Sequence, residues 1–358
     1  MTPPSVPSVH VYKNGLSVVG SPRLGGMVPP AEIFAPGRVT ECVDEAGRPN
    51  SSTREMLRRI PSVRNGFSVV SVFAQTALLI FCAVRFGPVV WIAVFVLMGR
   101  AHAQFASLMH EAAHRLLFRN RSLNDFVGRW LIGYVGFTNT DAYRRVHMAH
   151  HREEFGPNEP DIALYANYPI SRDSWQRKLV RDAVGRTGLR LLRDQLRGAR
   201  SEVVVVRNTL FKILAVQGVL IAGAIVTGYW WVYPVFWLLP YLTVWRVINR
   251  LRSVAEHGGL MASDDRRVAT HSVQQHWAAR FFLVPFNIGF HLAHHVDACV
   301  PFRNLPKYHQ MLVDSSYINV AGDDNDGSSK VAGNGRNGGN DRGYQYPNYR
   351  SLWSALHN

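Results

Sequence analysis

Two long apolar runs separated by a short turn dominate the early part of the chain. Residues 67–84 contain no charged side chain, and residues 89–109 are apolar apart from a few positions such as Arg100. A Phe-Gly-Pro sequence at 86–88 separates them, and glycine followed by proline favours a turn that starts a new helix. Because a helix needs about 20 mainly apolar residues to cross a bilayer, the pattern predicts a transmembrane helical hairpin over about 67–109.

A third apolar run predicts a second hairpin. Residues 213–245 are 33 consecutive positions without a charge, which is more than one membrane span requires. Gly228, Pro234 and Pro240 lie inside this run and predict a turn there. The second hairpin is therefore expected over about 208–250. Buried helices of a large soluble protein would give a similar pattern and remain the alternative.

The distribution of charge predicts how the hairpins are oriented. The chain has 358 residues, of which 18% are charged, and a net charge of +15. Basic residues are concentrated before, between and after the hairpins, whereas the two hairpin tips carry only Arg85. By the positive-inside rule, the N-terminal, middle and C-terminal segments are predicted to face the cytoplasm. The net charge then reflects topology and contact with lipid headgroups, and nothing favours a nucleic-acid partner.

Composition divides the chain into four segments. Residues 1–65 are predicted to be a cytoplasmic N-terminal segment, and residues 66–318 the membrane domain. Residues 319–345 are rich in Gly, Asn and Asp, which cannot bury apolar area, so they are predicted to be a disordered linker. Residues 346–358 form a C-terminal tail, with apolar positions that could dock back onto the domain. The three cysteines lack motif spacing, which excludes a zinc ribbon, a CxxC redox site and a thiolate iron–sulfur cluster.

Eight of the fifteen histidines fall into three clusters with helical spacing. The clusters have the patterns HxxxH, HxxHH and HxxHH and comprise His110 and His114; His147, His150 and His151; and His291, His294 and His295. Residues at i, i+3 and i+4 share one face of a helix, so each cluster directs its imidazoles to one side. Imidazole binds iron, copper, zinc and nickel, and eight donors are too many for one ion. The pattern therefore predicts a metal centre rich in histidine on the cytoplasmic side.

Two other metal sites compete with this interpretation. The first cluster is also an HExxH sequence, in which His110 and His114 would bind zinc and Glu111 would activate water, as in an intramembrane zinc protease. That hypothesis leaves both HxxHH clusters unexplained. A soluble di-iron bundle needs two ExxH motifs with further glutamate ligands, and Glu111 with His114 is the one suitably placed pair.

The three clusters, in this order around two membrane hairpins, resemble the histidine boxes of the membrane fatty acid desaturase family, which includes related hydroxylases. Sequences at 158–161, 252–258, 285–291 and 300–309 also resemble the family, and the similarity covers about 67–312. The resemblance implies an all-α integral membrane protein. It would have two transmembrane helical hairpins, giving four spans, and a cytoplasmic helical cap that holds a di-iron site.

The resemblance also implies a ligand set. Two iron ions (Fe2+/Fe3+), with O2 as co-substrate, would be held by the eight cluster histidines and by His257, which lies in an Arg-x-x-x-Glu-His-Gly element. Five further side chains are candidates for orienting the imidazoles: Glu111, Asp141, Asp161, Glu256 and Asn287. The chain departs from the family pattern at Asp297, Ala298 and His276, and these departures bear on the substrate more than on metal binding.

The implied reaction is oxygen-dependent desaturation of an acyl chain in a fatty acyl lipid or similar molecule. The same ligands serve hydroxylation, and some relatives act on carotenoids or on amino acid derivatives such as rhizobitoxine, so these alternatives stay open. The chain has no haem, flavin or ferredoxin motif. Electrons are therefore expected from a separate ferredoxin, rubredoxin or cytochrome b5. An acidic carrier would be steered to the basic cytoplasmic face.

Overall fold

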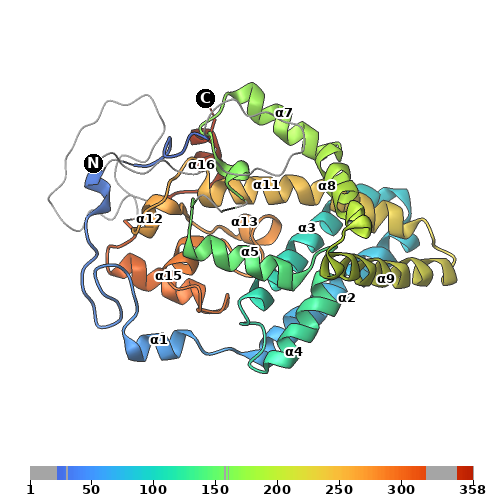
Figure 1. Ribbon diagram of the computed structural model, residues 1–358, viewed down its shortest axis with the longest axis horizontal. Helices are drawn as coiled ribbons and strands as arrows, with labels where there is room; N and C mark the ends of the chain where they lie inside the picture. The colour runs from blue at the N-terminus through green and yellow to red at the C-terminus, as the bar shows by residue number, and fades with distance from the viewer. Residues whose placement is uncertain (1–21, 30, 157–158, 160, 320–344, 358) are drawn as a thin grey trace.

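The computed structural model describes residues 22–29, 31–156, 159, 161–319 and 345–357. This part of the chain is mostly helical and includes two short strands (Figure 1). The predicted linker at 319–345 lies almost wholly outside the described residues, as does the beginning of the N-terminal segment.

The first apolar region forms a pair of consecutive helices, α2 (Ser62–Phe86) and α3 (Pro88–Ala113). Gly87 joins them with a φ of +65°, which residues with a side chain rarely adopt. Pro88 then starts α3, where the missing backbone N–H would have no partner within the helix. The helical hairpin therefore has its turn at the Phe-Gly-Pro sequence, as predicted.

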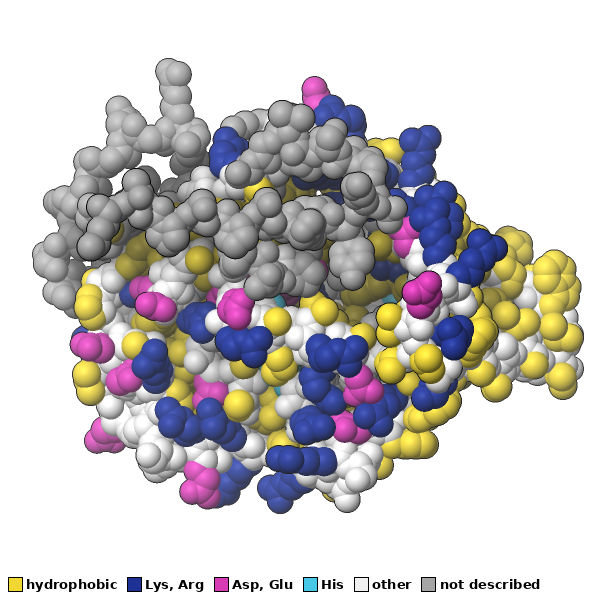
Figure 2. All heavy atoms as spheres, viewed as in Figure 1, with side chains coloured by type: hydrophobic (Ala, Val, Ile, Leu, Met, Phe, Trp, Pro, Cys, Tyr) yellow, Lys and Arg dark blue, Asp and Glu magenta, His cyan; other side chains and the backbone are white. Residues whose placement is uncertain are grey.

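Three described helices are long and apolar enough to cross a membrane: the one that ends at Phe86, α3, and α9 (Val204–Val226). Their outer faces carry exposed apolar side chains such as Val89 and Val226, which are 93% and 86% exposed. Figure 2 shows hydrophobic side chains gathered at the end of the molecule where α9 projects, while Lys and Arg are spread over much of the remaining face. Apolar surface of this extent fits contact with lipid.

The second limb of the second predicted hairpin is not one continuous helix. It consists of the π-helical segment η4 (Tyr233–Leu238), α10 (Leu239–Leu242) and α11 (Val244–His257). Pro234 and Pro240 lack the N–H that an α-helical hydrogen bond requires, and Thr243, with φ −120° and ψ −85°, interrupts the helix before α11. The described residues thus contain three continuous candidate spans, and the fourth stays a prediction.

The other helices before the C-terminal tail are η1 (Ala31–Phe34), α1 (Ser51–Leu57), α4 (Arg121–Phe126), the π-helical η2 (Val127–Gly133), α5 (Thr140–Arg152), α6 (Ile162–Tyr165), α7 (Arg172–Ala183), α8 (Arg186–Arg197), η3 (Gly198–Arg200), α12 (Arg266–Ala269), α13 (Trp277–Phe282), α14 (His291–Val296) and α15 (Leu305–Asp314). Of these, η2 and α5 pack on α3, and α6 and α7 pack on α11 (Figure 1). Gly99 lets α11 approach α3 closely, since a Cβ at this position would lie 2.3 Å from Cγ1 of Val244. The two helices that carry His110 and His257 are thereby packed together.

The C-terminal tail docks back onto α11. Its elements are β2 (Gln345–Tyr346), which pairs in parallel with β1 (Ser272–Val273), and α16 (Tyr349–Ala355). Leu352 is fully buried in an apolar cluster with Val254. The indole N–H of Trp353 donates to the carbonyl of Leu251 at 3.0 Å. The tail therefore supports the helix that ends at His257.

Candidate metal centre

Four helices bring the nine predicted ligands together. α3 supplies His110 in its last turn and His114 just after it, and α11 ends at His257. The two HxxHH clusters lie on α5 and α14. The start of α5 is fixed by Asn139, whose side chain accepts the backbone N–H groups of the next turn at 2.8 and 3.0 Å. This cap fixes the residue at which α5 begins, and with it the face of the helix on which the second cluster lies.

Five imidazoles converge in a first group, which comprises His110, His114, His147, His151 and His294. One ring nitrogen from each lies within 4.8 Å of all the others. Nε2 of His147 is 2.8 Å from Nε2 of His110 and 3.1 Å from Nε2 of His151. Nε2 of His151 is in turn 3.0 Å from that of His294. Nε2 of His114 is buried and has no hydrogen-bond partner among the described residues.

A second group lies next to the first. Single donor atoms of His150, His257, His295 and Glu154 fall within 4.8 Å of one another. His291 joins this group, because its Nε2 is 3.0 Å from Nε2 of both His257 and His295. The structure therefore gathers all nine predicted histidines into a set of five and a set of four.

The short distances between ring nitrogens fit imidazoles that bind a metal ion better than imidazoles without one. Burial lowers the pKa of His147 well below its ordinary value, with a further contribution from His110, and it lowers the pKa of His114 to about 3. Neutral rings carry one N–H and one lone pair each, so several Nε2 atoms that meet at one point cannot all be paired. Nitrogens bound at right angles to one ion, each about 2.1 Å away, are about 3.0 Å apart. Each group thus has the donors and spacing for a metal ion.

Residues 86–320, more than half of the chain, match the fatty acid desaturase family. The chain belongs to this family. A relative, dihydrorhizobitoxine desaturase of Bradyrhizobium elkanii, is 25% identical over 295 residues, which cover 75% of this chain and 82% of that protein. Both findings support a desaturase-type oxidoreductase, and the resemblance drawn from the histidine clusters is confirmed.

Glu159 holds one ligand of the second group in this desaturase-family chain. Its buried carboxylate accepts hydrogen bonds from Nδ1 of His150, the hydroxyl of Tyr165 and the backbone N–H of Phe155. Burial acts to lower the pKa of His150, but the hydrogen bond to Glu159 and its negative charge outweigh burial and raise that pKa. A proton fixed on Nδ1 leaves the Nε2 lone pair for a metal.

Glu154 contacts two further ligands. Its carboxylate lies 2.9 Å from Nδ1 of His295 and 3.4 Å from Nδ1 of His257. Arg266 holds the other oxygen at 2.7 Å, and burial raises the pKa of Glu154. Nδ1 of His257 makes its hydrogen bond to the carbonyl of Ala269 at 2.9 Å. Glu154 thus either orients the ring of His295 or, as a donor within the second group, binds an ion itself.

Glu256, unlike these two glutamates, was among the residues predicted from sequence. Its carboxylate is 3.7 Å from Nδ1 of His291 and pairs with Arg252 at 3.0 Å. Sequence reasoning missed Glu154 and Glu159. The available signals were the helical i+4 spacing from His150 to Glu154 and the place of Glu159 within the 158–161 sequence.

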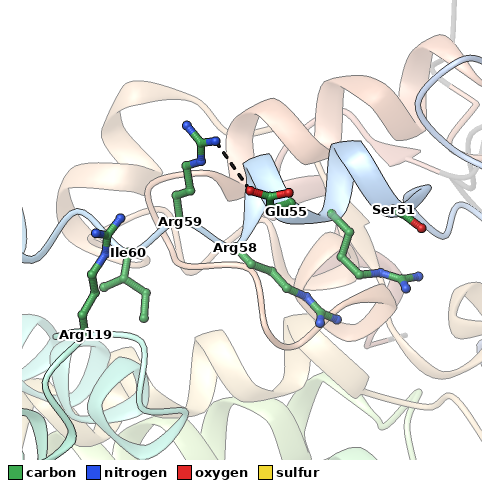
Figure 3. Close-up of a pocket in the computed structure, with 7 residues that line it drawn as sticks. Ser51, Glu55, Arg58, Arg59, Ile60 and Arg119 are labelled. Carbon is green, nitrogen blue, oxygen red and sulfur yellow. Dashed lines mark ion pairs between the residues drawn. The ribbon is translucent and has the colours of Figure 1, made fainter.

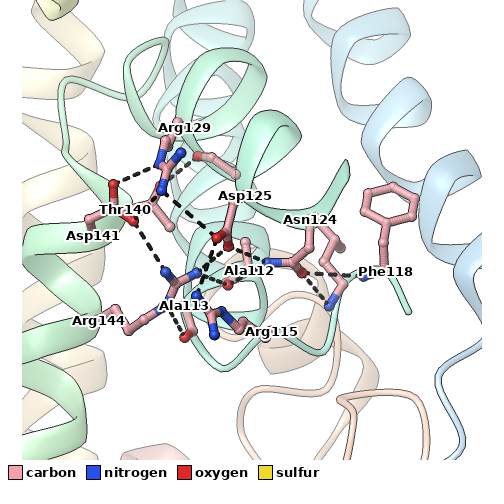
Figure 4. A network of polar contacts seen from close by, with 12 residues as sticks. Ala112, Ala113, Arg115, Phe118, Asn124, Asp125, Arg129, Thr140, Asp141 and Arg144 are labelled. Atoms are coloured by element: carbon pink, nitrogen blue, oxygen red, sulfur yellow. Dashed lines mark hydrogen bonds and ion pairs between the residues drawn. The ribbon is translucent and has the colours of Figure 1, made fainter. Parts of the chain in front are cut away.

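Arg144 joins the second cluster to the end of α3 (Figure 4). Its guanidinium donates to the carbonyls of Ala113 at 2.7 Å and Ala112 at 3.0 Å. It also pairs with Asp125 at 2.7 Å and Asp141 at 3.1 Å. Carbonyls in the last turn of a helix lack partners within it and favour a cation. These contacts fix α5 relative to the two histidines of the first cluster.

The other predicted orienting residues make no hydrogen bond to an imidazole within the described part of the chain. Asp141 faces arginines, as above, and Asp161 is half-buried. Glu111 accepts the backbone N–H of Phe302 at 3.1 Å. Asn287 donates to the carbonyl of the same residue at 3.2 Å. Glu111 and Asn287 therefore contact the segment after α14 rather than the rings.

Proposed function

We propose that this chain catalyses oxygen-dependent desaturation at a di-iron centre held by nine histidines. The observation that carries the proposal is the convergence of nine imidazoles into two groups in a chain of the desaturase family. When bound, the two irons, together with O2, would supply the oxidant needed to remove hydrogen from an unactivated C–H bond. One iron would be held by the group of five imidazoles and the other by the group of four.

The residues of the chain would hold and shield this centre. Seven of the nine rings are buried, which keeps bulk water from their ligand atoms, and His114 and His151 are partly buried. Glu154 and Glu159 contact Nδ1 atoms and so turn Nε2 inward. The ring of Tyr143 stacks on His147, with centroids 5.0 Å apart. Tyr143 therefore forms a wall of the site next to the first group.

The reaction has a fixed balance. A CH2–CH2 unit loses two hydrogen atoms to become CH=CH. O2 takes up these two hydrogen atoms together with two electrons and two protons and becomes two molecules of water. We expect an acyl chain or a specialised metabolite as the substrate, and the relative named for dihydrorhizobitoxine supports the second candidate. Hydroxylation of the same C–H bond is the alternative outcome.

The zinc-protease hypothesis has less support. It needs the carboxylate of Glu111 beside the metal, but that carboxylate accepts the backbone N–H of Phe302. It also uses only His110 and His114 among the clustered histidines and needs a third, usually acidic, ligand, whereas these two rings converge with three other imidazoles.

We further propose that the site faces the cytoplasm and receives electrons from a separate acidic carrier, namely a ferredoxin, a rubredoxin or cytochrome b5. A basic hollow of about 550 Å³ next to α1 supports a docking position (Figure 3). Its lining consists of Ser51, Arg54, Glu55, Arg58, Arg59, Ile60 and Arg119. Arg58 pairs at 2.9 Å with Asp297, two residues after His295. The hollow is therefore in direct contact with the end of the ligand helix α14.

Product analysis tests the proposed function. Cells that express the wild-type chain, with an electron donor and O2, are compared with cells that express His294→Ala. A compound that lacks two hydrogens and forms only with the wild type is the expected result. A hydroxylated product in its place would overturn desaturation in favour of hydroxylation. Peptide cleavage that persists in His294→Ala would overturn the oxidase altogether.

A further inference from the structure

A cavity of about 180 Å³ is lined by residues that adjoin the first imidazole group. α3, η2, α10 and α11 contribute to its walls. Met109, which precedes the ligand His110, and Tyr143, which stacks on His147, both line it. The cavity therefore begins where a C–H bond would have to meet the metal centre.

Arg246 lines the same cavity and has no anionic partner among the described residues. Its Nε and Nη2 atoms are buried without a hydrogen bond, and its guanidinium lies over the ring of Tyr241, 4.2 Å from the centroid. By contrast, Arg250 and Arg252 on the same helix pair with carboxylates. Buried N–H donors that lack a hydrogen bond are costly, so an anionic group in the cavity that paired with Nε and Nη2 would be stabilised.

The free edge of Arg246 has the geometry for a carboxylate. Nε and Nη2 form the side of a guanidinium that binds two oxygens at once. The same edge of Arg129 binds Asp141 at 2.7 and 3.2 Å (Figure 4). The Nε and Nη2 atoms of Arg58 bind Asp297 at 3.2 and 2.9 Å. In Arg246 the same two atoms make no hydrogen bond within the described residues and could bind a ligand carboxylate.

His102 adds an acceptor at the same end of the cavity. Its Nε2 is 3.0 Å from the carbonyl oxygen of Trp237. A carbonyl only accepts, so Nε2 carries the proton and Nδ1 a lone pair. That Nδ1 is buried without a partner among the described residues, and the ring lies 5.3 Å from that of Tyr241. Tyr241 thus packs against both His102 and Arg246.

The dimensions of the cavity limit the ligand. A cavity of about 150 Å³ binds one benzene molecule, so this cavity of about 180 Å³ suits a small molecule better than a whole long acyl chain. His102 precedes His110 by eight residues of α3, a distance of about 12 Å at 1.5 Å per residue. A short molecule can therefore bind at the polar end and still extend toward the imidazoles.

We propose that this cavity binds a small substrate with a carboxylate, held by Arg246, and an adjacent hydrogen-bond donor, held by Nδ1 of His102. The donor is an ammonium or a hydroxyl group. The bond to be oxidised then lies toward Tyr143. This inference rests on the proposed desaturase function and specifies its substrate class.

Binding to the purified, iron-loaded full chain tests the proposal. The probes are hexanoate and its uncharged analogue hexanamide, measured by calorimetry without an electron donor. Hexanoate is expected to bind more tightly, and Arg246→Gln to weaken hexanoate by roughly tenfold to a hundredfold while hardly changing hexanamide. Arg246→Lys keeps the positive charge but cannot bind two carboxylate oxygens with two parallel N–H groups, so it should give an intermediate loss of hexanoate affinity. The exposed Arg145→Gln is the control and should bind like the wild type.

The adjacent donor is tested with norleucine and α-hydroxyhexanoate. Each should bind more tightly than hexanoate, and His102→Phe should remove that preference without reducing the affinity for hexanoate. The tighter of the two identifies the donor group. Equal binding of hexanoate to wild type and Arg246→Gln, or preference for palmitate in both, would overturn the proposal. The readout needs no turnover, so a missing desaturation product would leave the binding result intact.

Discussion

Replacing Glu159 by Gln should release iron selectively from the second imidazole group. Three donors meet this buried carboxylate, namely Nδ1–H of His150, the hydroxyl of Tyr165 and the N–H of Phe155. Gln preserves the size of the side chain but turns one acceptor oxygen into an NH2 donor. The one remaining oxygen has two lone pairs and can accept two hydrogen bonds. At least one of the three donors to Glu159 would therefore face the NH2 group of the glutamine.

The expected loss of metal affinity follows from the one histidine ligand, His150, that Glu159 holds. Substitution of a residue that orients a metal-bound histidine typically costs about 10- to 100-fold in metal affinity. This corresponds to about 1.4–2.8 kcal/mol, at 1.4 kcal/mol per tenfold change. His150 belongs to the second group, and the first group keeps all of its own contacts. One of the two proposed irons should therefore leave faster, and the other should stay.

Iron content over time in the presence of a chelator measures this effect. The purified wild type and the Glu159→Gln variant are sampled for iron per chain by elemental analysis. Glu153→Gln is the control, because Glu153 is exposed and lies in the same segment. Retention of both irons by Glu159→Gln at the wild-type rate, or equal loss of both, would refute the assignment of Glu159 to the second group.

Three further outcomes are expected. Arg144→Met should lower the free energy of unfolding by about 1–3 kcal/mol, because the carbonyl of Ala113 loses its donor and the half-buried Asp125 and Asp141 each lose one of their arginines. Thermal unfolding in detergent should show no comparable loss for the exposed neighbour variant Arg145→Met. Gly99→Ala should destabilise by about 1–3 kcal/mol, because its Cβ would meet Val244 at 2.3 Å; a thermal midpoint equal to that of the wild type would contradict this packing. Arg59→Glu should slow turnover with an acidic protein donor in a salt-dependent manner and leave turnover with dithionite unchanged, whereas equal slowing with both reductants would exclude the docking position.

The sequence predicts the parts of the fold that depend on local pattern. The apolar runs and the Phe-Gly-Pro turn predict the α2–α3 hairpin, because span length and glycine geometry are local properties. The repeated i, i+3, i+4 spacing shows that each histidine cluster shares one face. It does not show how α5 meets α3, which depends on contacts such as those of Arg144 with Ala112 and Ala113.

Other features required the packed structure. The sequence pattern predicts that Pro234 and Pro240 lie in the turn of the second hairpin, but both lie in the helical segments η4 and α10, and Thr243 then separates α10 from α11. Asp141 was selected for its position near the second cluster, yet arginines neutralise it. Arg246 resembles many other basic residues in the sequence. That its Nε and Nη2 lack a hydrogen bond among the described residues is visible only where the cavity and its neighbours are known.

Elemental analysis of the detergent-purified chain, expressed with iron and zinc both available, tests the proposed metal centre most directly. About two irons per chain are expected, with iron lost on His150→Ala in the second group and on His294→Ala in the first. One zinc per chain, unaffected by those two changes and lost only on replacing His110 or His114, would contradict the di-iron centre.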